Sequence, residues 1–205
     1  MKSAKTFCGA ALTAAAIFTS VLAPAADAKS HPQLSLIDKA TCTKITQLAN
    51  EGKPVPDVSI LHDEDSLPGY FRDGVLKYKV EDNFPYRKQL DAAVADWNNS
   101  LEGKASLKEV SGDEVDDDTV KIQYRPEPGG FVQGSAIPSQ KRLVIKTATL
   151  MYPEALQGTI AHELGHLMGA GHSCDGALMA GANQKNISYH VTPLDVAAIV
   201  QGQFD

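Results

Sequence analysis

Residues 162–172 read HELGHLMGAGH, and this stretch decides how the rest of the sequence is interpreted. His162 and His166 are four residues apart, so on an α-helix their side chains share one face with Cβ atoms about 5 to 6 Å apart. Apolar residues recur at helical spacing on another face of the same segment. They are Ile160, Leu164, Leu167 and Met168. The pattern predicts an amphipathic helix that carries two imidazoles opposite its packing face.

The third histidine of the stretch cannot come from the same straight helix. His172 lies six residues after His166, and a continuing helix would carry it away from the other two. Gly169 and Gly171 lie between them, and glycine adopts positive φ without a Cβ penalty. We therefore expect both glycines to take positive φ, so that the helix ends and His172 returns to the other imidazoles.

Three imidazoles that converge in this way are the ligand set of a catalytic zinc, because the fourth tetrahedral position stays open for water. Glu163 directly follows His162, so it is rotated by roughly 100° around the helix and can flank a metal without binding it. A carboxylate there can take a proton from an attacking water and pass it to a leaving amine. The sequence predicts one Zn²⁺ held by His162, His166 and His172, with Glu163 as general base and acid in peptide hydrolysis.

The whole stretch resembles the long zinc motif of the metzincin metallopeptidases. Residues 175–179, DGALM, look like the Met-turn of that family, which implies that Met179 is an apolar, non-ligating support beneath the metal. Residues 173–179 and 191–199 are similar to matrixins, and small secreted snapalysin-like peptidases are the other close likeness. His172 departs from the Asp that snapalysin-type enzymes usually carry as third ligand. The subfamily therefore stays open.

This resemblance implies an α+β metzincin-like zincin domain with a twisted, mixed five-stranded sheet and about three helices. Alternating or apolar runs predict strands at residues 75–80, 107–110, 120–124 and 142–147, and helical spacing predicts helices near 90–101 and 193–201. Around Gly134, Ser135 and Ala136 the resemblance implies an antiparallel edge strand above the cleft. A loop is the alternative reading of those residues.

The N-terminal residues have the pattern of a secretory signal peptide. Two lysines precede an apolar stretch at about residues 7–23 and a small-residue cleavage site at residues 26–28. We assign residues 1–28 to the signal peptide, with cleavage after Ala25 or an uncleaved membrane anchor as alternatives. Residues 29–69 are either a propeptide or a structured N-terminal extension, with a short helix at 36–48, and residues 70–205 are the catalytic domain. A secreted, extracellular protein without membrane contact is expected.

Two cysteines remain after the signal peptide, Cys42 and Cys174. In an oxidising exported setting we expect them to form a disulfide. The alternative is a cysteine switch of the matrixin kind, in which the Cys42 thiolate occupies the open metal position. Residues 40–43 lack the Pro, Arg and Gly that flank the switch cysteine.

Charge narrows the choice of partners. The formal net charge of −6 argues against nucleic acid, which needs a basic footprint. An acidic run at residues 113–118 is either a solvated loop or a Ca²⁺ site rich in oxygen ligands. We expect a monomer that acts on protein or peptide substrates. The alternative from another functional class is a catalytically inactive, zinc-bearing binding module of the same fold.

Overall fold

The computed structural model describes residues 37–62, 70–126, 134–146, 152–181 and 186–202. All of them belong to one compact unit, residues 35–205. The expected signal peptide lies outside the described residues. No helix in the described ranges is long and apolar enough to cross a membrane.

The strands of the described chain form one mixed sheet of six strands in the order β1-β2-β4-β6-β5, with β3 paired to β2 off this path. Strand β2 is parallel to β3 and β4, and β4 is parallel to β6, whereas the pairs β1–β2 and β5–β6 are antiparallel. The expected α+β fold with a mixed sheet is confirmed, and the two-residue β1 is added to the five strands expected. The strands are β1 Phe71–Arg72, β2 Val75–Val80, β3 Ser106–Glu109, β4 Val120–Tyr124, β5 Gly134–Ile137 and β6 Arg142–Ile145.

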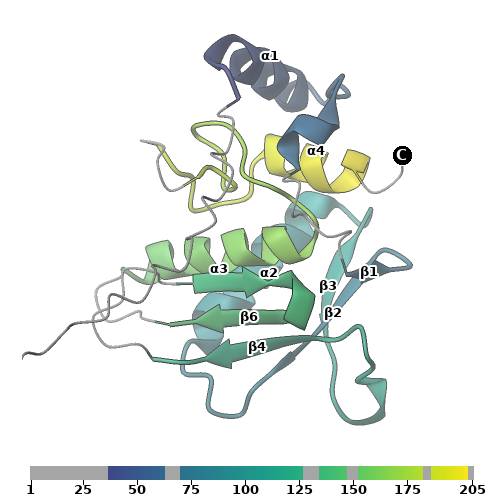
Figure 1. The fold of residues 1–205 in the computed structure, drawn as a ribbon, viewed down its shortest axis with the longest axis vertical. Coiled ribbons are helices and arrows are strands. Elements are labelled where there is room, and N and C mark those ends of the chain that lie inside the picture. The colour runs from purple at the N-terminus through teal and green to yellow at the C-terminus, as the bar shows by residue number, and fades with distance from the viewer. Residues whose placement is uncertain (1–36, 63–69, 127–133, 147–151, 182–185, 203–205) are drawn as a thin grey trace, which may run out of the picture. The chain divides into compact units, whose positions relative to one another are not determined.

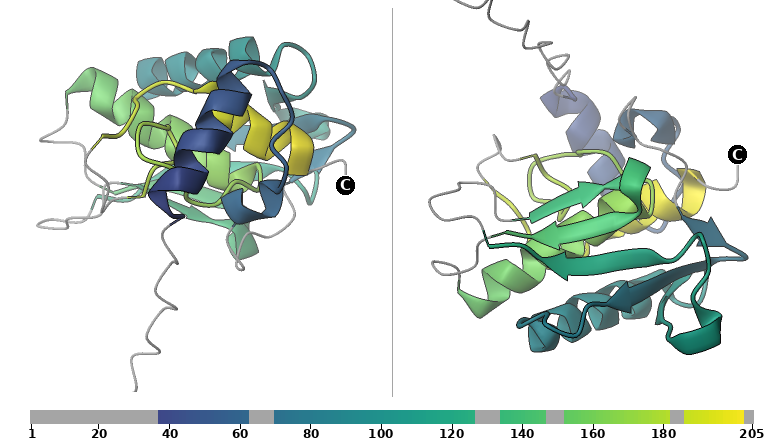
Figure 2. Two further views of the ribbon diagram at one scale, coloured as in Figure 1. Left: turned by 90° about the horizontal axis from the view of Figure 1, so that it is seen from above. Right: turned by 60° about the horizontal axis from the view of Figure 1, so that its bottom comes forward.

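Four α-helices accompany the sheet in the described residues: α1 Lys39–Asn50, α2 Arg87–Leu101, α3 Pro153–Leu167 and α4 Pro193–Gly202. Helices α2 and α3 pack against each other and against the sheet, while α1 and α4 lie together on the side of α3 away from the sheet (Figures 1 and 2). The predicted helix at 36–48 begins later, because Asp38 is its N-cap and accepts hydrogen bonds from two backbone N–H groups, those of Ala40 and Thr41.

The apolar stripe read from the sequence faces the core. Its four residues, Ile160, Leu164, Leu167 and Met168, are fully buried, so the prediction for α3 is confirmed. Trp97 of α2 is also fully buried, and its indole N–H donates to the Ala161 carbonyl of α3 at 2.8 Å. This contact fixes α3 against α2 through one specific hydrogen bond as well as through apolar packing.

A disulfide joins Cys42 of α1 to Cys174, which follows α3. The expected pairing is confirmed. The cysteine-switch alternative is wrong for this structure, because a Cys42 in a disulfide offers no thiolate to a metal.

Replacing Trp97 by Ala should lower the free energy of unfolding by about 3 to 5 kcal/mol, because it removes a large buried side chain and the bond to α3. Chemical denaturation of both proteins measures this difference. Tyr152→Ala is the control, since that side chain is 82% exposed and should change stability little. A Trp97 variant as stable as the control would contradict the packing described here.

Candidate metal centre

Three histidines come together at the C-terminal half of α3. The Nε2 atoms of His162 and His166 lie 3.1 Å apart. With His172 they form a set whose ligand atoms all lie within 4.8 Å of one another, and no other group of three or more His, Cys, Asp or Glu in the described ranges does so. The three side chains are half-buried. The set predicted from the sequence is therefore brought together in space.

The chain turns sharply after α3 to return His172. Gly169 has φ of 99°, as expected for a residue that ends a helix in the left-handed region. Gly171 does not have positive φ, so the expectation for that position is wrong. One left-handed residue is enough to redirect the chain, and the Gly171 N–H instead donates to the Leu61 carbonyl at 2.9 Å.

Backbone carbonyls orient two of the three rings. His162 Nδ1 lies 2.7 Å from the Leu178 carbonyl, and His166 Nδ1 lies 2.8 Å from the Ala170 carbonyl. A carbonyl only accepts, so each Nδ1 carries the proton and each Nε2 keeps its lone pair toward the cluster centre. This is the tautomer that a metal ligand needs.

The surroundings of His166 favour its neutral form. Burial first, and then the neighbouring rings of His162 and His172, lower the pKa of His166 to about 3. A metal binds the neutral form. Three converging imidazoles, two of them oriented by backbone carbonyls, suit Zn²⁺, whose tetrahedral sites use this donor set. The residues present therefore fit a zinc ion.

Glu163 lies beside the cluster and contacts the sheet. Its Oε2 accepts a hydrogen bond of 2.5 Å from the backbone N–H of Ala136 in β5. Burial raises the pKa of the Glu163 carboxyl, while His162 and the Ala136 N–H act in the opposite direction. The carboxylate is thus held at the boundary between α3 and the edge of the sheet.

Strand β5 approaches α3 closely because it contains a glycine. A Cβ placed on Gly134 would lie 2.9 Å from Thr159 Cγ2, closer than real Cβ atoms come, and 3.1 Å from Glu163 Cγ, which is tighter than most Cβ contacts. Strand β5 pairs antiparallel with β6 and is the last strand in the sheet order. The edge-strand reading of these residues is confirmed, and the loop reading is wrong.

Met179 is fully buried beneath α3. A Cβ on Gly165 would overlap its sulfur, so this glycine lets the methionine reach the helix between the first two histidines. The carboxylate of buried Asp195 accepts hydrogen bonds from the N–H groups of Leu178 at 3.1 Å and Met179 at 3.0 Å. Burial raises the pKa of the Asp195 carboxyl, and these donors, with Thr192, lower it.

The sequence also predicts a capped start for the last helix at Thr192, Pro193 and Asp195, but it predicts no contact from Asp195 to Met179 and no role for Gly165. The Thr192–Asp195 hydrogen bonds do cap α4. Asp195 also holds the backbone of Leu178 and Met179, which lie 17 and 16 residues before it in the sequence. A glycine inside a helical pattern was the one available signal for Gly165, since such a residue marks a close approach.

The acidic run gives no support to a calcium site. Asp116 pairs with Lys77 at 2.7 Å, and Asp118 pairs with Lys141 and Arg72, each at 2.9 Å. The hydrogen bond from Lys77, followed by that from Thr119, lowers the pKa of Asp116 to about 2. Carboxylates neutralised by cations in this way form the ion-paired surface of a loop.

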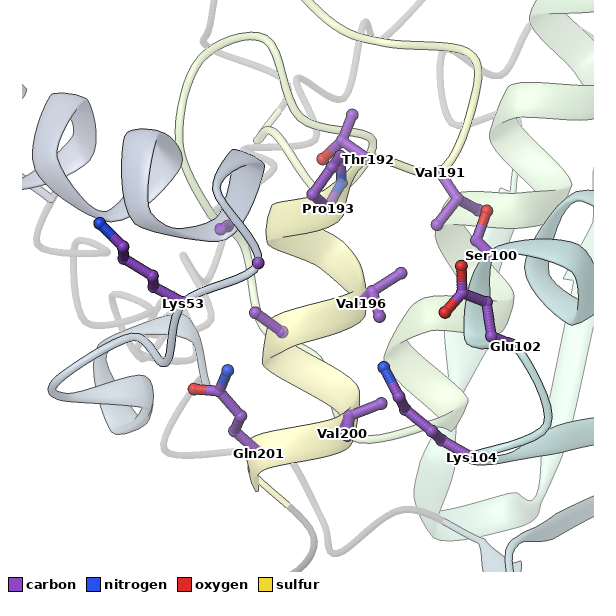
Figure 3. A pocket seen from close by; sticks show the side chains of 13 residues that line it. Lys53, Ser100, Glu102, Lys104, Val191, Thr192, Pro193, Val196, Val200 and Gln201 are labelled. Carbon is purple, nitrogen blue, oxygen red and sulfur yellow. The ribbon is translucent and has the colours of Figure 1, made fainter.

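A cavity of about 430 Å³ lies over α4, between the C-terminal ends of α1 and α2 (Figure 3). Val196 and Val200 of α4 line it, with Lys53 on the side of α1 and Glu102 on the side of α2. None of the three clustered histidines lines this cavity. It is separate from the candidate metal centre.

No family model and no curated protein matches the sequence. Among solved structures the chain is similar to the structure of myroilysin, with 16% identity and a TM-score of 0.36 over 53% of this chain and 46% of that chain. It is also similar to a zinc-dependent peptidase from Methanocorpusculum labreanum (strain Z), with 15% identity and a TM-score of 0.40 over 61% of this chain and 100% of that chain. Archaemetzincin from Archaeoglobus fulgidus, complexed with malonate, gives 16% identity and a TM-score of 0.40 over 61% and 99%. The chain thus spans less than half of myroilysin, and likenesses of this size assign no family.

The purified chain should bind one Zn²⁺, and His166→Ala should lose it, because two remaining imidazoles hold zinc far more weakly than three. Metal analysis after dialysis against trace zinc measures the stoichiometry. The control is His190→Ala, whose 57% exposed side chain lies outside the cluster, and which should keep the metal. Equal metal content in the His166 variant and the control would remove this assignment.

Proposed function

We propose that the protein is a zinc-dependent endopeptidase that hydrolyses peptide bonds in protein substrates. The observation that carries the proposal is the combination at α3: three converging imidazoles and a carboxylate, Glu163, held next to them against the edge strand. A purely structural zinc site is closed by four protein ligands and does not need such a carboxylate. The proposed subtype is metzincin, supported by the third histidine and by the buried Met179 beneath the helix.

The residues have distinct tasks in the proposed reaction. His162, His166 and His172 would hold the metal through Nε2 or an equivalent ring nitrogen. Bound zinc supplies Lewis acidity, which polarises the substrate carbonyl and lowers the pKa of water. Glu163 accepts the proton of the attacking water and delivers it to the leaving amine nitrogen as the peptide bond breaks.

The edge strand supports an extended peptide as the substrate. In an antiparallel pair, the N–H and C=O of one residue point to the same side of the strand. The Ala136 N–H points to Glu163 and therefore away from β6, so the Ala136 carbonyl also faces the open edge. A substrate strand could pair with this edge through main-chain hydrogen bonds, which binds peptides without requiring one sequence. The scissile bond would then lie near Glu163.

The alternative of an inactive zinc-bearing module is less well supported. Withdrawing a carboxylate from water costs free energy unless the carboxylate is paired and hydrogen-bonded. Glu163 meets that cost beside the three histidines, where a module that only bound zinc would gain nothing from it. Activity of the Glu163 variant described below separates the two functions.

We also propose that the protein is exported and loses residues 1–28. The charged, apolar and small-residue pattern of that segment supports this, and so does a disulfide, which is stable in oxidising compartments. Mass spectrometry of the protein in the medium of an expressing culture should give an N-terminus at Lys29 or at Ala26. Full-length chain retained in the cell would contradict export.

Replacing Glu163 by Gln should lower kcat for casein cleavage by about 10² to 10⁴-fold, because the amide cannot accept the proton, while zinc content stays at the wild-type value. Glu154→Gln is the matched control on the same helix, 65% exposed, and should keep wild-type activity. If Glu163→Gln cleaved casein at the wild-type rate with zinc bound, the proposed role would be wrong.

Replacing Gly134 by Ala should lower kcat by about 10-fold or more without loss of zinc, because the new methyl group pushes on Thr159 and Glu163 and misplaces the carboxylate. In the double variant Gly134→Ala/Thr159→Ser, the Thr159 methyl group that the new side chain at position 134 would contact first is absent. This variant should regain part of the activity. Ser139→Ala, on the exposed turn after β5, serves as control. An unchanged kcat in Gly134→Ala would show that the close approach does not orient Glu163.

A further inference from the structure

The third ligand lies beyond the end of the helix that carries the other two, and backbone hydrogen bonds to α3 hold the chain after it as far as Ala170. His162 and His166 are fixed by α3, whereas His172 lies in the irregular segment after it, residues 168–174. Within this segment the Ser173 N–H donates to the Met179 carbonyl at 2.8 Å. Gly171 and Cys174, which flank His172 and Ser173, contact another part of the chain.

Both of those contacts come from the N-terminal segment, residues 37–62. The Leu61 carbonyl accepts from the Gly171 N–H at 2.9 Å, one residue before His172. Cys42 is joined to Cys174, two residues after His172 and 132 residues away in sequence. The N-terminal segment therefore contacts the chain both before and after His172.

The N-terminal segment can hold the His172 loop in place because the segment is itself bound to α4. The Val55 N–H donates to Gln201 Oε1 at 2.9 Å, and His62 Nε2 lies 3.0 Å from the Ala198 carbonyl. Leu61 is fully buried, and Ile45 is only 3% exposed. Figure 1 shows α1 lying over α4 and the loops that follow α3. Removing the segment would expose this part of the core, unlike the release of a loosely docked propeptide.

We propose that residues 37–62 stay with the catalytic unit and position His172, with the Cys42–Cys174 disulfide and the Leu61–Gly171 hydrogen bond as the two positioning contacts. The proposal rests on the proposed zinc site. The sequence left residues 29–69 as either a propeptide or a structured extension. Under this proposal, residues 37–62 are a structured extension that is not removed. Contacts that orient ligands from outside the ligand set typically affect metal affinity by about 10 to 100-fold.

The test replaces both cysteines in the full chain, Cys42→Ser/Cys174→Ser. A single replacement would leave a free thiol two residues from His172, and thiolates are good zinc ligands. The double variant should bind Zn²⁺ about 10 to 100-fold more weakly in competition with a chelator of known affinity. The Co²⁺-loaded variant should also differ from wild type in the visible absorption bands that report ligand geometry.

The control is Leu107→Ala, a core replacement in β3, which pairs with β2 and not with the strands next to α3. It should lower thermal stability without changing zinc affinity or the Co²⁺ spectrum. If the double variant does not fold, phosphine reduction of the folded, metal-free wild type, followed by methylation of both freed thiols, breaks the same bond before the titration without leaving a thiolate that could bind zinc. A disulfide-free protein with wild-type zinc affinity and Co²⁺ spectrum overturns the proposal. Wild-type protein that binds no zinc would instead overturn the proposed function, so the two failures are distinct.

Discussion

The site depends on one geometric constraint: three imidazoles must meet at a point, although one helix can supply only two of them. The periodicity of helix α3 brings His162 and His166 to one face, and backbone carbonyls orient their two rings. The opposite face of the helix is buried against Trp97 and the core. His172 must be returned by a turn at Gly169 and then held there. Much of the structure beyond the sheet can be understood as the means of holding that return.

Helix α4 is the common frame for these contacts. Its buried Asp195 binds the backbone of Leu178 and Met179, which places the methionine beneath α3. Its C-terminal half binds the N-terminal segment, residues 37–62, and Leu61 of that segment contacts the loop of His172. Helix α4 therefore positions Met179 directly through Asp195, and it positions the His172 loop indirectly through residues 37–62. A carboxylate as deeply buried as Asp195 is tolerated because N–H and O–H donors satisfy it.

Local patterns in the sequence predicted what local physics determines. The strands Val75–Val80 and Val120–Tyr124 have the predicted bounds, and the burial of the α3 stripe follows from its 3.6-residue period. The motif gave the three histidines and Glu163 because their spacing is itself a geometric statement. Gly171 was expected at positive φ from its identity alone, yet its N–H is used by Leu61, a partner that no local pattern announces. The integration of residues 37–62 likewise depends on contacts across more than 100 residues, such as Cys42 to Cys174.

The measurement that tests the account most directly is a back-titration of the metal. The purified protein is stripped of metal with a chelator, dialysed, and assayed for casein cleavage as Zn²⁺ is added. The account predicts no cleavage by the stripped protein and a return of activity that is complete at one equivalent of Zn²⁺. Undiminished cleavage by the stripped protein would contradict it, and so would a metal-loaded protein that cleaves nothing.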